Sequence, residues 1–473
     1  MAKKTINKEL TGAQDLYNFL FEACNIIRGP VSQDNFKDYI TPLLYYKRIS
    51  DVYDEETEEA LISSGGDKEY ASLPEQHRFV IPDGCHWQEV RERTENLGAA
   101  IVGAMRQIEI ANPDTLYGVL SMFSSQKWTN KAILNDSKIR DLIEHLSKRK
   151  LGNKDYPADL MGDAYEILLK KFADDSKAQA GEFYTPRSVV RLLVHILDPQ
   201  PGETVYDPAC GSGGMLIEAI RYMHDDSLCC GSIFGQEKNV VNAAIAKMNL
   251  FLHGASDFNV MQGDTLRDPK ILQGGNIAKF DCVIANPPFS LENWGATEWS
   301  SDKYKRNIYG TPSDSCGDYA WIQHMICSMS SGKGRMAVVM PQGILFRGNQ
   351  EAEIRKQLVE SDLIEAVVTL GDKLFYGTGL SPCFLIIRRM KPAHHSGRIL
   401  MIDGSKILTQ KRAQNILEEN DIDRLYSLYQ NYSDEEDYSR IVTLQEIRDK
   451  EYNLSPNRYV VYHKEEIRPY VEV

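Results

Sequence analysis

Residues 203–223 read ETVYDPACGSGGMLIEAIRYM, and this stretch decides the fold. The short apolar run ETVYDPAC predicts a strand that ends at a glycine turn. The residues after it, GMLIEAIRYM, place apolar side chains at helical spacing and predict a helix. A strand that passes into a helix through glycines is typical of α/β proteins, because glycine lets the backbone turn sharply and approach a ligand closely.

The same alternation continues along the chain. CGSIFGQE predicts a second strand and NVVNAAIAKMNLFLHG a second helix, and NVMQGDTL and FDCVIANPPF predict the third and fourth strands. RMAVVMPQ, LIEAVVTL and CFLIIRR extend the series. Strands that alternate with helices predict an α/β fold with a mainly parallel, doubly wound sheet. Ligands of such sheets bind outside the carboxyl ends of the strands, near a topological switch point.

The flanking regions have other patterns. Residues 1–173 carry apolar residues at helical spacing, as in DNFKDYITPLLYYKRISDVYDEE, and predict a mainly helical N-terminal domain with one irregular insertion. Residues 174–400 contain the predicted sheet. Residues 401–473 predict a helical C-terminal tail of mixed charge, for which docking to another subunit is the expected role.

The composition is that of an ordinary folded protein, with 42% apolar and 26% charged residues. No run of about 18 apolar residues predicts a membrane span, and the N-terminus, MAKKTINKEL, has no apolar signal region. The 9 cysteines are scattered without a CxxC pair, which indicates neither a zinc ribbon nor a disulfide framework. We therefore expect a cytoplasmic protein without a membrane association.

The glycine turn is the first candidate ligand site. The dinucleotide fingerprint GxGxxG is not met, because its last position is Leu216, and no Gly-Lys-Ser/Thr follows that would complete a P-loop. The alternative is a tight strand-to-helix turn that binds nothing. The candidate cofactor-binding residues of this turn are Asp207, Ala209, Cys210, Gly211, Ser212 and Gly213.

Two acidic residues end the next two predicted strands. Glu237 is placed to accept the ribose hydroxyls of a nucleoside-like cofactor, although alone it is only an exposed acid. Asp264 is placed to accept a hydrogen bond from an adenine amine, and a helix N-cap or turn residue is an equally good interpretation.

The fourth predicted strand ends in Asn286-Pro287-Pro288-Phe289. The two prolines fix two φ angles and remove two donors, which leaves carbonyl groups and the asparagine oxygen facing outward in a rigid arc. An arc of acceptors beside an aromatic ring suits an amine donor on a flat base. The alternative is a loop that is merely stiffened by proline.

A fourth segment precedes the first predicted strand. Thr185 or Ser188 could cap the helix SVVRLLVHIL, and the aromatic residues before it could cover a cofactor. The candidate residues of this segment are Glu182, Phe183, Tyr184, Thr185, Pro186 and Arg187.

The order and spacing of these motifs resemble a known family. DPACGSGGML resembles the cofactor loop of class I methyltransferases, FDCVIANPPFS the catalytic motif of amino-group DNA methyltransferases, and GEFYTPRSVVRLLV the segment that precedes the cofactor loop in the gamma-ordered adenine-N6 subgroup. The chain resembles most closely the modification (M) subunit of type I restriction-modification systems. This resemblance covers nearly the whole length, and the first two motifs are its specific part.

The resemblance implies an adenine-specific DNA methyltransferase that uses S-adenosyl-L-methionine. It also implies partners: DNA, a specificity (S) subunit that reads the sequence, a second M subunit and a restriction (R) subunit. Such partners account for the net charge of −13, since a strongly acidic chain is poorly suited to hold DNA phosphates alone.

The expected chemistry follows from the asparagine motif. The Asn286 oxygen and the Pro287 carbonyl would accept the two N–H bonds of the adenine amine, so that its lone pair faces the methyl group. Phe289 would stack on a flipped base. No metal is needed, and we expect none. Two alternatives stay open: methylation of RNA adenine or of a protein glutamine, and a non-catalytic clamp that keeps the fold.

Overall fold

The computed structural model describes residues 2–116, 118–120, 125–175, 185–223, 231–255, 257–375, 381–411 and 414–463. The chain divides into two compact units. The first comprises Met1–Ala180 together with Val240–Ser256, and the second comprises Gly181–Asn239 together with Asp257–Val473.

The first unit is helical, which confirms the prediction of a mainly helical N-terminal domain. In it α1 packs against α8 and α9, and the middle of α2 is buried, with the Tyr46 hydroxyl donating to the Cys85 carbonyl at 2.7 Å. Its helices are α1 (Ala2–Ile27), α2 (Phe36–Ser63), α3 (Lys68–Ala71), α4 (Trp87–Arg91), α5 (Leu97–Ala111), α6 (Pro113–Leu116), α7 (Ser125–Thr129), α8 (Asp136–Leu146), α9 (Ala158–Asp175) and α12 (Val240–Leu252), with short 3-10 turns η1 (Gln33–Asn35) and η2 (Pro74–Gln76).

Helix α12 forms where the sequence predicts it, but it groups with the first unit rather than with the sheet. Its buried Phe251 ring lies 5.1 Å from the ring of Tyr45 and 5.0 Å from that of Phe79. The guanidinium of Arg78 lies 4.8 Å from the centre of the Phe251 ring. The sequence-derived boundary at residues 173 and 174 therefore misses a helix that the chain contributes to the helical unit from within the sheet domain.

The second unit is built on a nine-stranded mixed sheet in the order β11-β10-β8-β9-β7-β6-β1-β2-β3. All seven predicted strands form. Strands β3, β2, β1, β6 and β7 run parallel, and β9 lies antiparallel between β7 and β8. The strands are β1 (Val205–Asp207), β2 (Ile233–Glu237), β3 (Phe258–Gln262), β6 (Cys282–Ala285), β7 (Arg335–Pro341), β8 (Ile364–Leu370), β9 (Pro382–Arg388), β10 (Arg398–Gly404) and β11 (Ser439–Thr443), beside a separate hairpin of β4 (Leu272–Gln273) and β5 (Asn276–Ile277).

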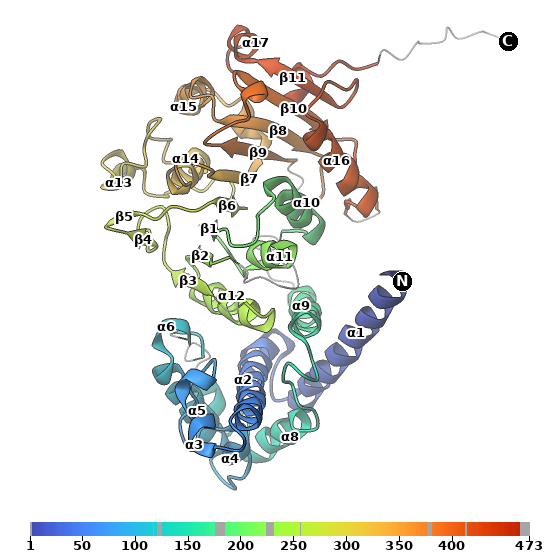
Figure 1. Cartoon of the computed structure of the whole chain (residues 1–473), viewed down its shortest axis with the longest axis vertical. Coiled ribbons are helices and arrows are strands. Elements are labelled where there is room, and N and C mark those ends of the chain that lie inside the picture. Colours follow the sequence, from blue (N-terminus) through green and yellow to red (C-terminus); the bar gives the residue numbers. More distant parts are fainter. Residues whose placement is uncertain are drawn as a thin grey trace, which may run out of the picture. The chain divides into compact units, whose positions relative to one another are not determined.

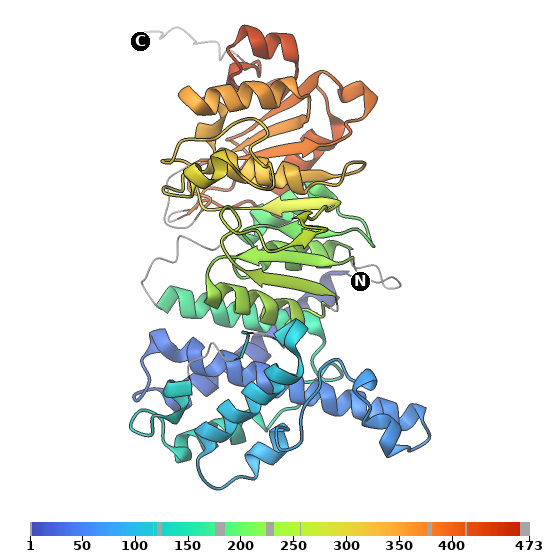
Figure 2. The ribbon, with the colours of Figure 1, turned by 90° about the vertical axis from the view of Figure 1, so that its left-hand side faces the viewer.

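Helices cover both faces of this sheet. On one face lie α10 (Arg187–Leu197), α11 (Gly214–Met223) and α16 (Glu419–Asn431), which pack on one another and on the strands (Figure 1). Figure 2 shows the other face, with α14 (Asp318–Ser328) and α15 (Asn349–Glu360). The short α13 (Ala296–Ser300) follows β6. Two covered faces explain why the central strands are buried along their whole length, as their unbroken apolar runs require. Among the described residues, no helix combines the length and the apolar character that crossing a bilayer requires.

The C-terminal segment contains the predicted helical turns, α16 and α17 (Leu444–Asp449), but it also completes the sheet. The predicted boundary at residue 400 falls inside β10, and β11 pairs antiparallel with β10. Part of the expected docking segment packs on its own sheet: Leu454 and Tyr459 are buried, and the Leu454 amide donates to the Leu345 carbonyl at 2.9 Å. Docking of another subunit to this region stays a prediction.

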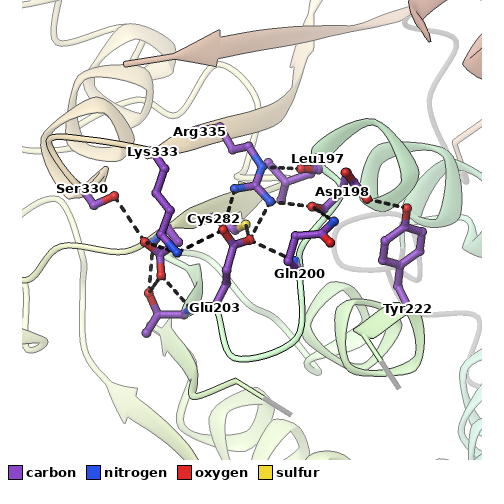
Figure 3. A network of polar contacts seen from close by, with 11 residues as sticks. Leu197, Asp198, Gln200, Glu203, Tyr222, Cys282, Ser330, Lys333 and Arg335 are labelled. Atoms are coloured by element: carbon purple, nitrogen blue, oxygen red, sulfur yellow. Dashed lines mark hydrogen bonds and ion pairs between the residues drawn. The ribbon is translucent and has the colours of Figure 1, made fainter. Parts of the chain in front are cut away.

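A polar network joins the amino ends of three central strands (Figure 3). Glu203 precedes β1, Arg335 begins β7, and the guanidinium donates to both oxygens of the carboxylate at 3.1 and 2.6 Å. Asp281, before β6, accepts from the amide of Thr204 at 3.1 Å. The Cys282 thiol donates to Glu203 at 3.4 Å. These contacts hold the start of β1 against the starts of β6 and β7.

The charge state of Glu203 depends on this network. Burial opposes its ionisation, but the hydrogen bonds from Arg335 and from the Gln200 amide outweigh that effect and lower the pKa of Glu203 to about 2. The carboxylate is therefore ionised in the folded protein throughout the neutral and mildly acidic range.

We predict that Glu203→Gln lowers the free energy of unfolding by about 3 kcal/mol at pH 7, because it leaves the buried Arg335 cation without its counter-charge. A carboxyl with a depressed folded pKa stabilises the protein above its unfolded pKa of about 4.3 and loses that effect as the pH falls towards 2. The gap between wild type and variant should therefore be constant above about pH 5 and shrink below it. Urea unfolding at a series of pH values measures this gap.

Glu360→Gln is the matched control, because Glu360 pairs with Arg448 at 2.7 Å on the surface. Exposed ion pairs contribute little to stability, so its effect should be much smaller. Equal losses for the two variants, or a gap for Glu203→Gln that does not change with pH, would contradict the assigned role of the network.

Candidate functional site

A cavity of about 570 Å³ lies at the carboxyl ends of β1, β2, β3 and β6 in the second unit. Strand β1 has β2 on one side and β6 on the other, so the chain order reverses at this place. Crevices at such a switch point are the usual ligand sites of open α/β sheets. The predicted site residues that line the cavity are Thr185, Asp207, Ala209, Cys210, Gly211, Ser212, Glu237, Asp264, Asn286 and Pro288.

Some predicted site residues do not line it. Arg187 begins α10, and its Nε lies 3.9 Å from the carboxylate of Glu218 on α11. Phe289 is half-buried, with its ring 6.2 Å from the ring of Phe375. The other described candidates outside the wall are Pro186, Gly213 and Pro287. The predicted residues Glu182, Phe183 and Tyr184 lie outside the described residues.

The turn after β1 has the left-handed backbone that glycine permits. Gly211 has φ +54° and Gly213 has φ +86°, so a side chain at either position would strain the turn. The Cys210 amide donates to the Gln236 carbonyl at 3.1 Å, which holds the turn against β2. Helix α11 starts at Gly214, directly after the turn.

Glu237 closes this turn from the end of β2. Its Oε2 accepts from the Gly211 amide at 2.9 Å, and its Oε1 accepts from the Asn239 amide at 2.6 Å. The side chain is buried, and burial raises the pKa of Glu237 although the backbone N–H groups oppose the rise. The Lys238 amide also donates to this carboxylate, and since a carboxylate has about four acceptor sites, one stays free for a ligand hydroxyl.

Asp207 is the most deeply buried acid of the site. It ends β1 and its Oδ1 accepts from the Ala209 amide at 2.9 Å. Burial raises the pKa of Asp207 to about 8; the Ala209 amide opposes the rise and the nearby Glu237 charge adds to it. A carboxyl held in this state gains most from a cation, because an opposite charge would stabilise its ionised form.

Asp264 serves the turn after β3. Its Oδ1 accepts from the amides of Leu266 and Arg267 at 3.2 and 3.3 Å, and its Oδ2 lies 2.9 Å from the Lys238 ammonium. The turn-capping alternative therefore describes what this carboxylate does in the structure. It also lies on the cavity wall, where a hydrogen bond to a ligand amine stays a prediction.

Asn286 stands at the end of β6, directly after Ala285. Its Nδ2 donates to the Thr185 Oγ1 at 2.7 Å, while its Oδ1 is buried and has no partner. The capping interpretation of Thr185 is wrong, because no side chain caps α10 and Pro186 occupies the N-cap position. A buried acceptor without a partner is costly and rare, so it marks this oxygen as a place for a ligand donor.

A clamp that the sequence did not predict holds the chain after the asparagine motif. Ser290 has a strained φ of +50°, and its amide donates to Asp318 Oδ1 at 2.7 Å. Arg347 donates to Asp318 Oδ2 at 2.8 Å and to the Ser290 hydroxyl at 3.2 Å. The only signal for it was the segment GILFRG, which carries Arg347 but does not indicate a partner.

A second network holds the turn after β3. The Thr265 hydroxyl donates to the Pro208 carbonyl at 2.6 Å and so joins this turn to the glycine turn. The buried Arg306 donates to the carbonyls of Thr265 and Leu266, both at 2.8 Å. Among the described residues, no group of three His, Cys, Asp or Glu side chains is arranged to hold a metal ion. The wall of the cavity thus carries the carboxyl groups of Asp207, Glu237 and Asp264, and hydrogen bonds hold the turns that form it.

The chain is similar to known families along most of its length. Residues 156–467 match the family described as N-6 DNA Methylase, which is more than half of the chain. Residues 16–146 match the HsdM N-terminal domain. The first match contains every residue of the cavity.

Individual relatives agree with these matches. The methylase subunit of the type I restriction enzyme MjaVII from Methanocaldococcus jannaschii is 35% identical over 448 residues, which cover 90% of this chain and 75% of that protein. The EcoKI methylase subunit of Escherichia coli K12 is 27% identical and covers 77% of this chain and 65% of that protein. A crystal structure of a type I restriction-modification methyltransferase subunit from Streptococcus thermophilus has a TM-score of 0.79 and 26% identity, with 95% of this chain and 100% of that chain covered. The chain belongs to the N-6 DNA methylase family and, within it, to the methylase subunits of type I restriction enzymes.

Proposed function

We propose that this chain transfers a methyl group from S-adenosyl-L-methionine to the N6 amine of adenine in DNA, as the modification subunit of a type I restriction-modification complex. The observation that carries this proposal is the buried, unpartnered Oδ1 of Asn286 on the wall of an acidic cavity. The family membership supports the chemistry, and we assign the residues of the cavity to it.

The Asn286 oxygen is the acceptor that we assign to the adenine amine, with the Pro287 carbonyl as the second. Two acceptors on a stiff backbone hold both N–H bonds of the amine and leave its lone pair free to react. Proline fixes φ, so the acceptors need little reorganisation when substrate arrives. Phe289 is the residue that we assign to stacking on the base, a contact worth roughly 1–3 kcal/mol.

The cavity fits S-adenosyl-L-methionine, which when bound supplies the methyl group on a positively charged sulfur. Glu237 keeps an acceptor site for a ribose hydroxyl, and the turn at Gly211 lets the backbone approach the ligand. The wall carries Glu237, Asp264 and Asp207, and a ligand with positive charge would stabilise the ionised form of Asp207.

The base must leave the duplex to reach the Asn286 oxygen, because this oxygen is buried at the end of a strand. The net charge of −13 supports a complex in which other subunits hold the DNA. A specificity subunit, a second modification subunit and a restriction subunit are the partners that we propose, since the relatives are named as subunits of type I restriction enzymes.

Asn286→Ala should reduce the single-turnover rate of DNA methylation by about 10²–10³, because it removes an aligned acceptor from an enclosed site. The dissociation constant of S-adenosyl-L-methionine should stay nearly unchanged, since the side chain is assigned to the substrate amine. Asn286→Asp should keep part of the activity, because it retains the shape and an acceptor. The assay uses the co-purified complex, unmethylated genomic DNA and radiolabelled cofactor.

RNA and protein extracts in the same assay test the other substrate classes. Methyl transfer to either of these instead of to DNA would overturn the proposed substrate. Normal turnover in Asn286→Ala would overturn the site, and binding of cofactor without transfer to any substrate would identify a non-catalytic clamp.

Cofactor binding should also release a proton from Asp207. With a pKa of about 8, this carboxyl is mostly protonated at pH 7 in the free protein. A bound cation lowers that pKa, so the affinity should rise with pH up to about 8 and then level off. Calorimetric titration at pH 7 in two buffers of different ionisation enthalpy measures the released protons. Asp207→Asn should bind without this release, and a wild-type protein that releases none would remove Asp207 from the cationic site.

A further inference from the structure

The contact between Thr185 and Asn286 assigns a role to a residue that the sequence placed with the cofactor. We infer that Thr185 is a positioning residue: its hydroxyl anchors the Asn286 amide so that the side-chain oxygen, and not the NH₂ group, faces the substrate amine. This inference rests on the proposed function, because it concerns how the acceptor of that reaction is held.

The nitrogen and the oxygen of the Asn286 amide have different surroundings. Nδ2 donates to the Thr185 Oγ1 at 2.7 Å, and Oδ1 is buried without a partner on the same cavity wall. The two residues come from different places in the fold, since Thr185 precedes α10 and Asn286 follows β6. The hydrogen bond therefore connects the segment that leads into α10 to the residue that follows β6.

An asparagine amide needs such an anchor, because its two ends have nearly the same shape. Rotation by a half turn about χ2 exchanges the oxygen and the nitrogen at little steric cost. The exchanged amide would present N–H donors to an amine that is itself a donor, and no hydrogen bond could form. Only the orientation seen here satisfies Nδ2 and leaves Oδ1 for the substrate at the same time.

A hydroxyl can donate as well as accept, so Thr185 alone would tolerate either orientation of the amide. The substrate amine and the Thr185 oxygen together select the orientation of the Asn286 amide. When the amine donates to Oδ1, Nδ2 must find an acceptor, and the Thr185 oxygen is that acceptor. Without the hydroxyl, Nδ2 would become an unsatisfied buried donor in the productive orientation, which disfavours that orientation.

The identity of residue 286 decides how much the anchor matters. A carboxylate has two equivalent oxygens, and either can accept from the amine. In Asn286→Asp the orientation problem disappears, and the hydroxyl loses its selective role. The effect of removing the Thr185 hydroxyl should therefore depend on whether residue 286 is asparagine or aspartate.

The test is a double-mutant cycle with the co-purified complex, unmethylated genomic DNA and saturating radiolabelled S-adenosyl-L-methionine. Thr185→Val keeps the shape and removes the hydroxyl. It should lower the single-turnover rate about ten-fold or more when residue 286 is asparagine, and about three-fold or less on the Asn286→Asp background. Thr185→Ser keeps a hydroxyl and should retain most of the activity. The cofactor dissociation constant and the melting temperature, measured on each variant, should stay close to those of the parent.

The outcomes distinguish a positioning role of Thr185 from a direct contact of Thr185 with the cofactor. If Thr185→Val weakens cofactor binding equally on both backgrounds and leaves the saturated rate unchanged, Thr185 contacts the cofactor and the positioning inference fails. Equal rate losses on both backgrounds also overturn it, because a general structural role does not depend on residue 286. If Asn286→Ala itself stays active, the proposed function fails, and that result is obtained independently of Thr185.

Discussion

The pairing of β1 with β6 is the constraint on which the site depends. Val205 lies opposite Cys282 and Tyr206 opposite Val283, so the two parallel strands end side by side. The glycine turn follows the carboxyl end of β1, and Asn286 follows the carboxyl end of β6. The Glu203–Arg335 network fixes the opposite ends of these strands, which makes the register at the carboxyl edge a consequence of contacts far from the cavity. A slip of this register would separate Asn286 from the glycine turn.

The cavity concentrates polar groups whose hydrogen-bonding capacity is not fully used. Asp207 is buried with a raised pKa, and Glu237 accepts from three backbone amides, which leaves one of its acceptor sites free. The Asn286 oxygen has no partner at all. Each of these groups lowers the stability of the ligand-free protein and gains when a cation or a donor arrives. Ligand binding and the stability of this edge are therefore coupled.

The sequence predicts the fold well where local pattern is sufficient. FDCVIANPPF and RMAVVMPQ are unbroken apolar runs, which is what strands buried on both faces require, and they form β6 and β7. Prediction from the sequence fails where a contact with a residue far away in the chain decides the local structure. Thr185 has the right type and place for a helix cap, yet its hydroxyl contacts Asn286, which is 101 positions away. Asp318 and Arg347 act on Ser290 only after folding, so no local pattern could indicate them. Phe251 likewise lies in a helix with the expected periodicity, but its aromatic neighbours come from the N-terminal region.

The electrostatics of the cavity rim limit what this chain can do alone with a polyanion. Lys238, the one basic residue among the described residues that line the cavity, is paired with Asp264 at 2.9 Å. Beyond it, Arg267 lies 3.8 Å from Glu298, and Arg347 is held by Asp318 at 2.8 Å. Binding of DNA phosphates depends on cations that can release the phosphate counterions, and a paired cation must first give up its own partner. Each of these three cations is engaged by a carboxylate of the same chain, and we propose that the attraction for phosphate comes largely from the partner subunits.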